Sequence, residues 1–202
     1  MALVMESEPD DIPTFLYRAK CGALGVTFHG DVDDNSAAAF EDALQYVEKH
    51  TPAKTVVPLF ISSTGGDVYC AMIIIALMRS SPLEIHTIAV GACMSAAAVI
   101  FSFGKRRFVG ENATVMLHGV RVEAFEGKLK DVEIEAAEMR RLNTRMWSMM
   151  SVNCGKTEDY LQQSLQNETD YYVTPEQAIE MGLATDIGVP RLTMQVCLRV
   201  AT

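Results

Sequence analysis

The amino-acid sequence predicts an α/β fold built on parallel strands. Two consecutive stretches, residues 55–80 and residues 85–103, repeat the order strand, glycine-containing turn, helix. Strands joined through a helix pair in parallel by a right-handed crossover. The chain of 202 residues is long enough for one hydrophobic core and hardly for two, so we expect a single domain over residues 1–202.

The first elements follow in order from residue 24. LGVTF at 24–28 is short and β-prone, and the DVDDN after it supplies capping side chains for a helix over 36–50. Pro52 stops this helix, and TVVPLFIS at 55–62 predicts a buried strand. STGG then forms a turn, after which Asp67 opens a long apolar helix.

The second unit repeats this order. IHTIAV at 85–90 favours a strand, GACM at 91–94 a turn, and SAAAVIFSF at 95–103 a helix that Gly104 ends. This stretch is long and free of Asp, Glu, Lys and Arg, so a membrane span is the alternative. A buried strand that leads into a buried helix explains its mixed propensities better, and we expect no membrane association.

The remaining elements complete the chain. RFVG and ATVMLHG predict two short strands, and an apolar stripe predicts a long helix over 128–152 with Gly155 as its C-terminal cap. Thr174, Pro175 and Gln177 form a capping-box pattern that opens a last helix, which Gly182 ends.

The composition excludes several classes of protein. With 49% hydrophobic and 21% charged residues, the chain is not disordered, and its net charge of -9 argues against a nucleic-acid partner. Five cysteines stand far apart, without a CxxC or a histidine pair, so they predict reduced thiols and no zinc site. MALVMESEPDD lacks the pattern of a secretory signal, and we expect a cytoplasmic protein.

Four features could carry chemistry, and each has an ordinary structural alternative. Ser95 lies at a strand-to-helix turn, where serine is most often a helix cap. His118 ends a β segment, where a histidine is commonly a polar surface residue, and Asp170 stands where aspartate usually forms a turn. Gly65 and Gly66 precede a helix, where they either expose a backbone N–H or simply form a tight turn.

Taken in order, these features resemble the Clp protease proteolytic subunit (ClpP) family over about residues 22–187. STGGDV matches the family's glycine-rich turn, GACMSAAAVIFSFGKRRF its serine segment, NATVMLH its histidine strand, and ETDYYVTPEQAIEMGLAT its aspartate loop with the helix after it. The resemblance implies a ClpP/crotonase-like superhelix of strand-turn-helix units with a protruding handle helix.

By this resemblance the whole chain is one ClpP-like peptidase domain. Its head would take about residues 20–125 and 155–190, its handle helix about 128–152, and an acidic N-terminal segment residues 1–20.

The resemblance also implies the site residues. Ser95 would be the nucleophile, His118 the general base and acid, and Asp170 the carboxylate that orients the imidazole. The N–H groups of Gly66 and Ala96 would form the oxyanion hole. The implied activity is hydrolysis of peptide bonds by acyl transfer, with no metal or organic cofactor.

The partners implied by the family are a homo-oligomeric ring, a heptamer or a paired tetradecamer, and an ATP-driven AAA+ unfoldase that feeds unfolded polypeptide into the chamber. ATP would be the ligand of the unfoldase. The Met-rich stripe of the long helix and its Trp147 fit the element through which rings stack, whereas core packing or a partner groove explains Met146, Met149 and Met150 equally well.

The chain departs from the family pattern at several positions. Thr64 replaces a proline before the two glycines, Ala97 replaces a glycine after the serine, and HGV at 118–120 replaces His-Gln-Pro. Thr169 stands where an arginine normally precedes the aspartate and supports contacts between rings. The acidic N-terminus and the tail VPRLTMQVCLRVAT show no recognisable family pattern.

Two other functions compete with proteolysis. A non-catalytic Clp ring subunit would usually lose one of the three catalytic residues, and this chain retains all of them. A crotonase-like acyl-CoA enzyme would share the glycine turn without needing Ser95 or His118, and 202 residues are few for it. A peptidase with a Ser-Lys dyad is weaker still, since Lys105 reads as the flank of a helix end.

Overall fold

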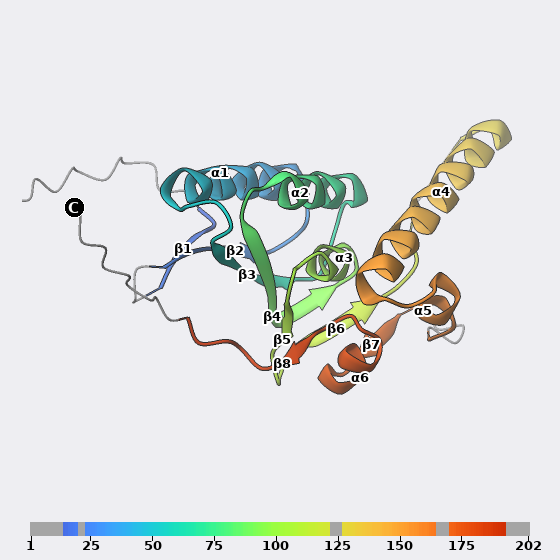
Figure 1. Ribbon diagram of the computed structural model, residues 1–202. Helices are drawn as coiled ribbons and strands as arrows, with labels where there is room; N and C mark the ends of the chain where they lie inside the picture. Colours follow the sequence, from blue (N-terminus) through green and yellow to red (C-terminus); the bar gives the residue numbers. More distant parts are fainter. Residues whose placement is uncertain (1–13, 20–22, 122–126, 165–169, 193–202) are drawn as a thin grey trace, which may run out of the picture.

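The computed structural model describes residues 14–19, 23–121, 127–164 and 170–192, within which eight strands and six helices form one mixed sheet and its cover (Figure 1). The strands are β1 (Leu16–Arg18), β2 (Leu24–His29), β3 (Val56–Ser63), β4 (Glu84–Met94), β5 (Arg107–Val109), β6 (Thr114–Leu117), β7 (Tyr171–Val173) and β8 (Asp186–Ile187). The helices are α1 (Asp34–His50), α2 (Val68–Ser80), α3 (Ala96–Ser102), α4 (Leu129–Cys154), α5 (Glu158–Ser164) and α6 (Pro175–Glu180).

The predicted α/β architecture of parallel strands is confirmed. β2, β3 and β4 are neighbours and pair in parallel, and α1 and α2 connect them. The two helices lie side by side along one face of the sheet (Figure 1). Asp33 begins α1 with a capping box, in which its carboxylate accepts from the Ser36 N–H at 2.7 Å.

The predicted turn at 91–94 is wrong, because β4 continues without interruption to Met94. Its pairing with β3 shifts register after Ile61 and resumes where Ser63 faces Cys93. Beyond the shift, β4 also pairs with β6, so the ladder supplies backbone partners that a turn would have lacked. The helix after it runs from Ala96 to Ser102, inside the predicted bounds.

The sheet divides along β4. Thr87 to Ala89 pair with β5, whereas Ala92 to Met94 pair with β6, both in parallel. β8 continues the first branch beside β5, and β7 lies antiparallel on β6 in the second. The second branch therefore starts where β4 approaches its carboxyl end.

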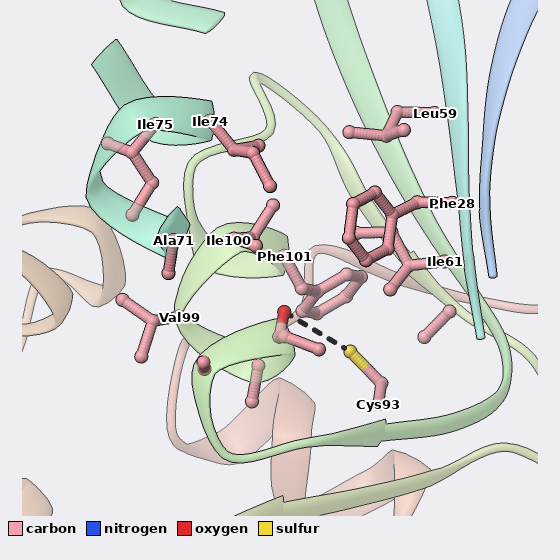
Figure 2. Packing of buried hydrophobic residues seen from close by; sticks show 14 of the residues in the cluster. Phe28, Leu59, Ile61, Ala71, Ile74, Ile75, Cys93, Val99, Ile100 and Phe101 are labelled. Carbon is pink, nitrogen blue, oxygen red and sulfur yellow. Dashed lines mark hydrogen bonds between the residues drawn. The ribbon is translucent and has the colours of Figure 1, made fainter. Parts of the chain in front are cut away.

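The core lies between the sheet and the helices, and α3 is at its centre. All seven residues of α3 are buried, and Figure 2 shows Val99, Ile100 and Phe101 packed towards α2 and the β2–β3 side chains. Three successive alanines begin α3, and their small side chains allow it to enter the core. The hydroxyl of Thr87, fully buried on β4, donates to the carbonyl of Phe101 at 2.7 Å.

The long helix α4 projects beyond the rest of the molecule (Figure 1). Its C-terminal half is anchored by buried Leu142, Met146, Trp147 and Met150, while its first turns are exposed. The predicted helix over 128–152 and its cap are confirmed, since α4 ends at Gly155 with φ of 64°. None of the described helices is long and apolar enough to traverse a lipid bilayer.

Candidate active site

Ser95 lies at the junction between β4 and α3 in a strained backbone conformation. Its φ of 54° and ψ of -126° are rare for a residue with a side chain. The Ser95 N–H donates to the Met116 carbonyl of β6 at 2.8 Å, which holds the residue against the second branch of the sheet. The alternative of a capping serine is wrong, because the side chain makes no cap hydrogen bond to α3.

Two glycines hold the turn before α2 beside Ser95. Gly65 has φ of +102°, and a Cβ built on it would stand 2.6 Å from the Ser95 Cβ. Gly66 has φ of +145°, and a Cβ there would stand 2.4 Å from the Val32 carbonyl oxygen. Only glycine therefore suits either position, for reasons of both backbone conformation and space.

Two backbone N–H groups near Ser95 donate no hydrogen bond to another described residue. Ala96 opens α3, and the N–H groups in the first turn of a helix have no partner within it. Among the hydrogen bonds between described residues, neither the Ala96 N–H nor the Gly66 N–H is a donor. Such groups stabilise negative charge that develops beside them.

The strand pairing brings Ser95, His118 and Asp170 to one edge of the second branch. Ser95 follows β4, and His118 follows the parallel strand β6, so both emerge at carboxyl ends. Asp170 precedes β7, whose Tyr171 faces Leu117 of β6 in the antiparallel pair. His118 and Asp170 are thus the neighbours in sequence of the last pair of this ladder, and both lie at the same end of it.

The side chains of His118 and Asp170 have other partners. His118 Nδ1 contacts the carbonyl oxygen of Gly119. Because that oxygen can only accept, Nδ1 carries a proton, and in a neutral imidazole with this tautomer Nε2 has the lone pair. Asp170 Oδ1 accepts from the Arg121 guanidinium instead. No hydrogen bond between described side chains joins Ser95 to His118, or His118 to Asp170.

A cleft of about 520 Å³ opens at this edge. Ser95 and His118 both line it, together with the Gly66 turn and the start of α2. Its wall combines apolar side chains with charged ones, and the lining residues are Gly66, Asp67, Val68, Ser95, His118, Gly119, Val120, Arg121 and Met146. Ser95 and His118 therefore border one shared cleft, the kind of concave surface at which ligands bind.

The described cysteines are poor candidates for a nucleophile. Burial raises the pKa of Cys154 to about 11 and, with the Asp34 carboxylate as hydrogen-bond acceptor, that of Cys70 to about 12. Burial also raises the pKa of Cys93, whose thiol contacts the Ala97 carbonyl in Figure 2. All three are therefore thiols near neutral pH, whereas the thiolate is the reactive form. No three His, Cys, Asp or Glu side chains of the described residues are grouped to hold a metal ion.

The comparison with known proteins identifies the family to which the fold belongs. A family model described as Clp protease matches residues 13–191. The chain belongs to the Clp protease family. The parallel α/β core with its projecting α4 is the fold of this Clp family, as the sequence predicts.

Two curated Clp relatives have similar sequences. The ATP-dependent Clp protease proteolytic subunit 1 of Corynebacterium glutamicum is 30% identical over 158 residues, which cover 77% of this chain and 74% of that protein. The protein of the same name from Corynebacterium efficiens is also 30% identical over 158 residues, with the same coverage of both chains.

Arg121 is the residue of this Clp family site that sequence reasoning missed. It stands three residues after His118, directly after the HGV segment that replaces the family's His-Gln-Pro pattern. A cation so close to the histidine was the available signal, but its partner Asp170 lies 49 residues away in sequence. Only the antiparallel pairing of β6 with β7 brings the two together. Thr169, also noted in the sequence, lies outside the described residues.

Proposed function

We propose that this chain is a serine endopeptidase. Ser95 is the nucleophile, His118 is the general base and then the general acid, and Asp170 orients the imidazole. The N–H groups of Gly66 and Ala96 receive the oxyanion. The observation that carries the proposal is the convergence of the ends of β4 and β6 and the start of β7 at one edge of the sheet, in a chain of the Clp protease family.

The proposed reaction proceeds in two steps, acylation of Ser95 and then hydrolysis of the acyl-enzyme. His118 Nε2 takes the hydroxyl proton of Ser95 while the oxygen attacks the peptide carbonyl, and the new oxyanion accepts from the two N–H groups. Collapse breaks the C–N bond, and the imidazolium returns its proton to the leaving amine. Water then attacks the acyl-enzyme with His118 again as base, which releases the carboxylic acid and restores the serine.

The conformation of His118 supports its role as a base. Transfer from Ser95 needs a lone pair on Nε2, and the Nδ1–H tautomer leaves it there. The Gly119 carbonyl carries no full negative charge. A carboxylate beside Nδ1 would supply one and so stabilise the imidazolium.

The proposal includes a ring assembly. In this assembly α4 is the handle, about residues 128–152, and it makes the contacts between rings. The head comprises about residues 20–125 and 155–190. The support for these contacts is the exposed apolar side chains on the first turns of α4, Leu129, Val132 and Ile134. We expect seven or fourteen copies, fed with unfolded polypeptide by an AAA+ unfoldase, in the cytoplasm. A native mass of seven or fourteen times the 22.2 kDa chain would support this, and a stable monomer would contradict it.

A fluorophosphonate probe tests the catalytic proposal. The purified chain should be labelled on Ser95, while Ser95→Ala should lose both labelling and cleavage of an unstructured peptide. Ser80→Ala, which changes an exposed serine at the end of α2, is the matched control and should behave as wild type. Equal labelling of wild type and Ser95→Ala would exclude Ser95 as the nucleophile.

A non-catalytic Clp ring subunit is the second candidate function. The observation that favours it is the side-chain pairing, because Asp170 contacts Arg121 and His118 contacts Gly119. A chain that assembles but is neither labelled nor active, alone or with an unfoldase, would select this candidate. Family membership disfavours the third, a crotonase-like acyl-CoA enzyme.

A further inference from the structure

We infer that Arg121 is a positioning residue that holds the Asp170 carboxylate away from His118 in the resting site. This inference rests on the proposed function, because it concerns the acid of the proposed catalytic triad. It assigns to Arg121 control over whether Asp170 and His118 are coupled.

The first observation is competition for one carboxylate. Asp170 Oδ1 accepts from an Arg121 terminal nitrogen, and no hydrogen bond between described residues joins Asp170 to His118. The guanidinium is permanently charged, whereas the imidazole of a resting base is neutral. A carboxylate offered both partners is therefore held more strongly by Arg121.

The second observation is the proximity of the alternative partner. His118 follows Leu117 and Asp170 precedes Tyr171, and Leu117 and Tyr171 are the last pair of the β6–β7 ladder, so the backbones of His118 and Asp170 lie at the same end of it. Rotation of the two side chains, without a change in strand register, can bring the carboxylate to Nδ1. The Gly119 carbonyl meanwhile keeps His118 in the tautomer that this contact requires.

The third observation is that the pair can be broken. The Arg121 side chain is 49% exposed and that of Asp170 is 31% exposed, so water and salt reach the contact. Ion pairs at such exposure are weak. Arg121 also lines the cleft with Ser95, where a bound substrate can contact it. The resting arrangement is therefore one that substrate or assembly can reverse.

Substitution of Arg121 tests the inference directly. In Arg121→Gln the freed carboxylate should reach His118, and the rate of Ser95 labelling by a fluorophosphonate should rise about threefold to fivefold, because an ion pair as exposed as this one can withhold the carboxylate by no more than about 1 kcal/mol. With a fluorogenic peptide, kcat should rise while KM stays within about twofold. Arg121→Lys, which retains a cation, should stay within about 1.5-fold of wild type.

Two further variants separate the inference from a general effect of removing an arginine. Arg106→Gln removes the ion pair between Arg106 and Asp186, which matches the Arg121 pair in exposure because the two side chains are 53% and 30% exposed. This variant should leave the labelling of Ser95 unchanged. Arg121→Gln with Asp170→Asn should lose the whole gain, because the effect of Arg121 acts through Asp170. A gain that survives Asp170→Asn, or no gain in Arg121→Gln, overturns the inference.

A structure of Arg121→Gln distinguishes failure of the inference from failure of the proposed function. Asp170 within hydrogen-bond distance of His118 Nδ1 supports the inference even if no variant is labelled, an outcome that rejects the peptidase alone. Asp170 still remote from His118 overturns the inference and leaves the labelling of wild type and Ser95→Ala to decide the function.

Discussion

Gly65 and Ser95 approach so closely that a single added methyl group would not fit between them. A Cβ on Gly65 would lie 2.6 Å from the Ser95 Cβ and 2.8 Å from the Met94 carbonyl oxygen. The glycine turn before α2 and the strained serine after β4 thus fix each other's position. Ser95, with φ of 54°, depends on such neighbours to hold its backbone.

Gly65→Ala should therefore disable the site. We expect a loss of at least about tenfold in Ser95 labelling and about 1–3 kcal/mol of stability, because backbone strain adds to a clash that cannot relax cheaply. Gly188→Ala is the matched control, with φ of +106° at the substituted residue and no atom within 4 Å of the added Cβ. It shares the strain without the clash, so equal labelling of the two variants would refute the role of this contact.

Salt should activate the wild-type chain if the Arg121 and Asp170 pair restrains it. Raising ionic strength from about 0.05 M to about 0.5 M screens exposed charges. Ser95 labelling should increase several-fold in wild type and remain level in Arg121→Gln. A rise of the same size in both would trace the effect to something other than this pair, and labelling of a model serine hydrolase controls for the probe.

The cap of α1 should contribute measurably to stability. Asp33→Ala leaves the Ser36 N–H without its acceptor and should cost about 1 kcal/mol, the usual value of an N-cap. Asp33→Asn keeps a side-chain oxygen there and should stay within about 0.5 kcal/mol of wild type. Thermal unfolding at one chain concentration measures both variants, because assembly would shift the midpoint with concentration.

Alkylation of cysteines should depend steeply on pH. Burial raises the pKa of Cys154 to about 11 and that of Cys70 to about 12, so each thiolate becomes more abundant by about tenfold per unit between pH 8 and 10. At pH 8 both should react with iodoacetamide at least about a hundredfold more slowly than in the urea-unfolded chain. Site-resolved mass spectrometry measures this, and native rates equal to the unfolded ones would show that these sites open freely.

Much of the fold could be predicted because its signals are local. The capping box at Thr174 and Gln177, the apolar stripe of α4 and the glycine after it each depend on neighbours a few residues away. The candidate site residues are predicted in another way, from short motifs that occur in the same order as in the ClpP family. For Ser95 the sequence also allows an ordinary helix cap, and the structure excludes that alternative because the side chain makes no cap hydrogen bond.

The features that escaped prediction depend on long-range pairing. GACM was expected to be a turn because Gly91 interrupts an apolar strand, yet pairing with β6, which begins 20 residues after β4 ends, extends β4 to Met94. The contact of Arg121 with Asp170 likewise requires β7 to return beside β6. Neither could follow from composition or spacing, because the partners are absent from the local sequence.

Because the sheet branches at β4, we expect the two halves of the site to differ in mobility. β6 pairs with β4 through three residue pairs, Ala92 with Thr114, Cys93 with Val115 and Met94 with Met116. β6 and β7 therefore form a narrow two-stranded leaf that is attached to the C-terminal end of β4. Swinging that leaf would move the imidazole and the carboxylate together relative to the hydroxyl, while β3 and the buried helix stay still. Amide hydrogen exchange should accordingly be slowest in β3 and the first half of β4, and faster across the leaf.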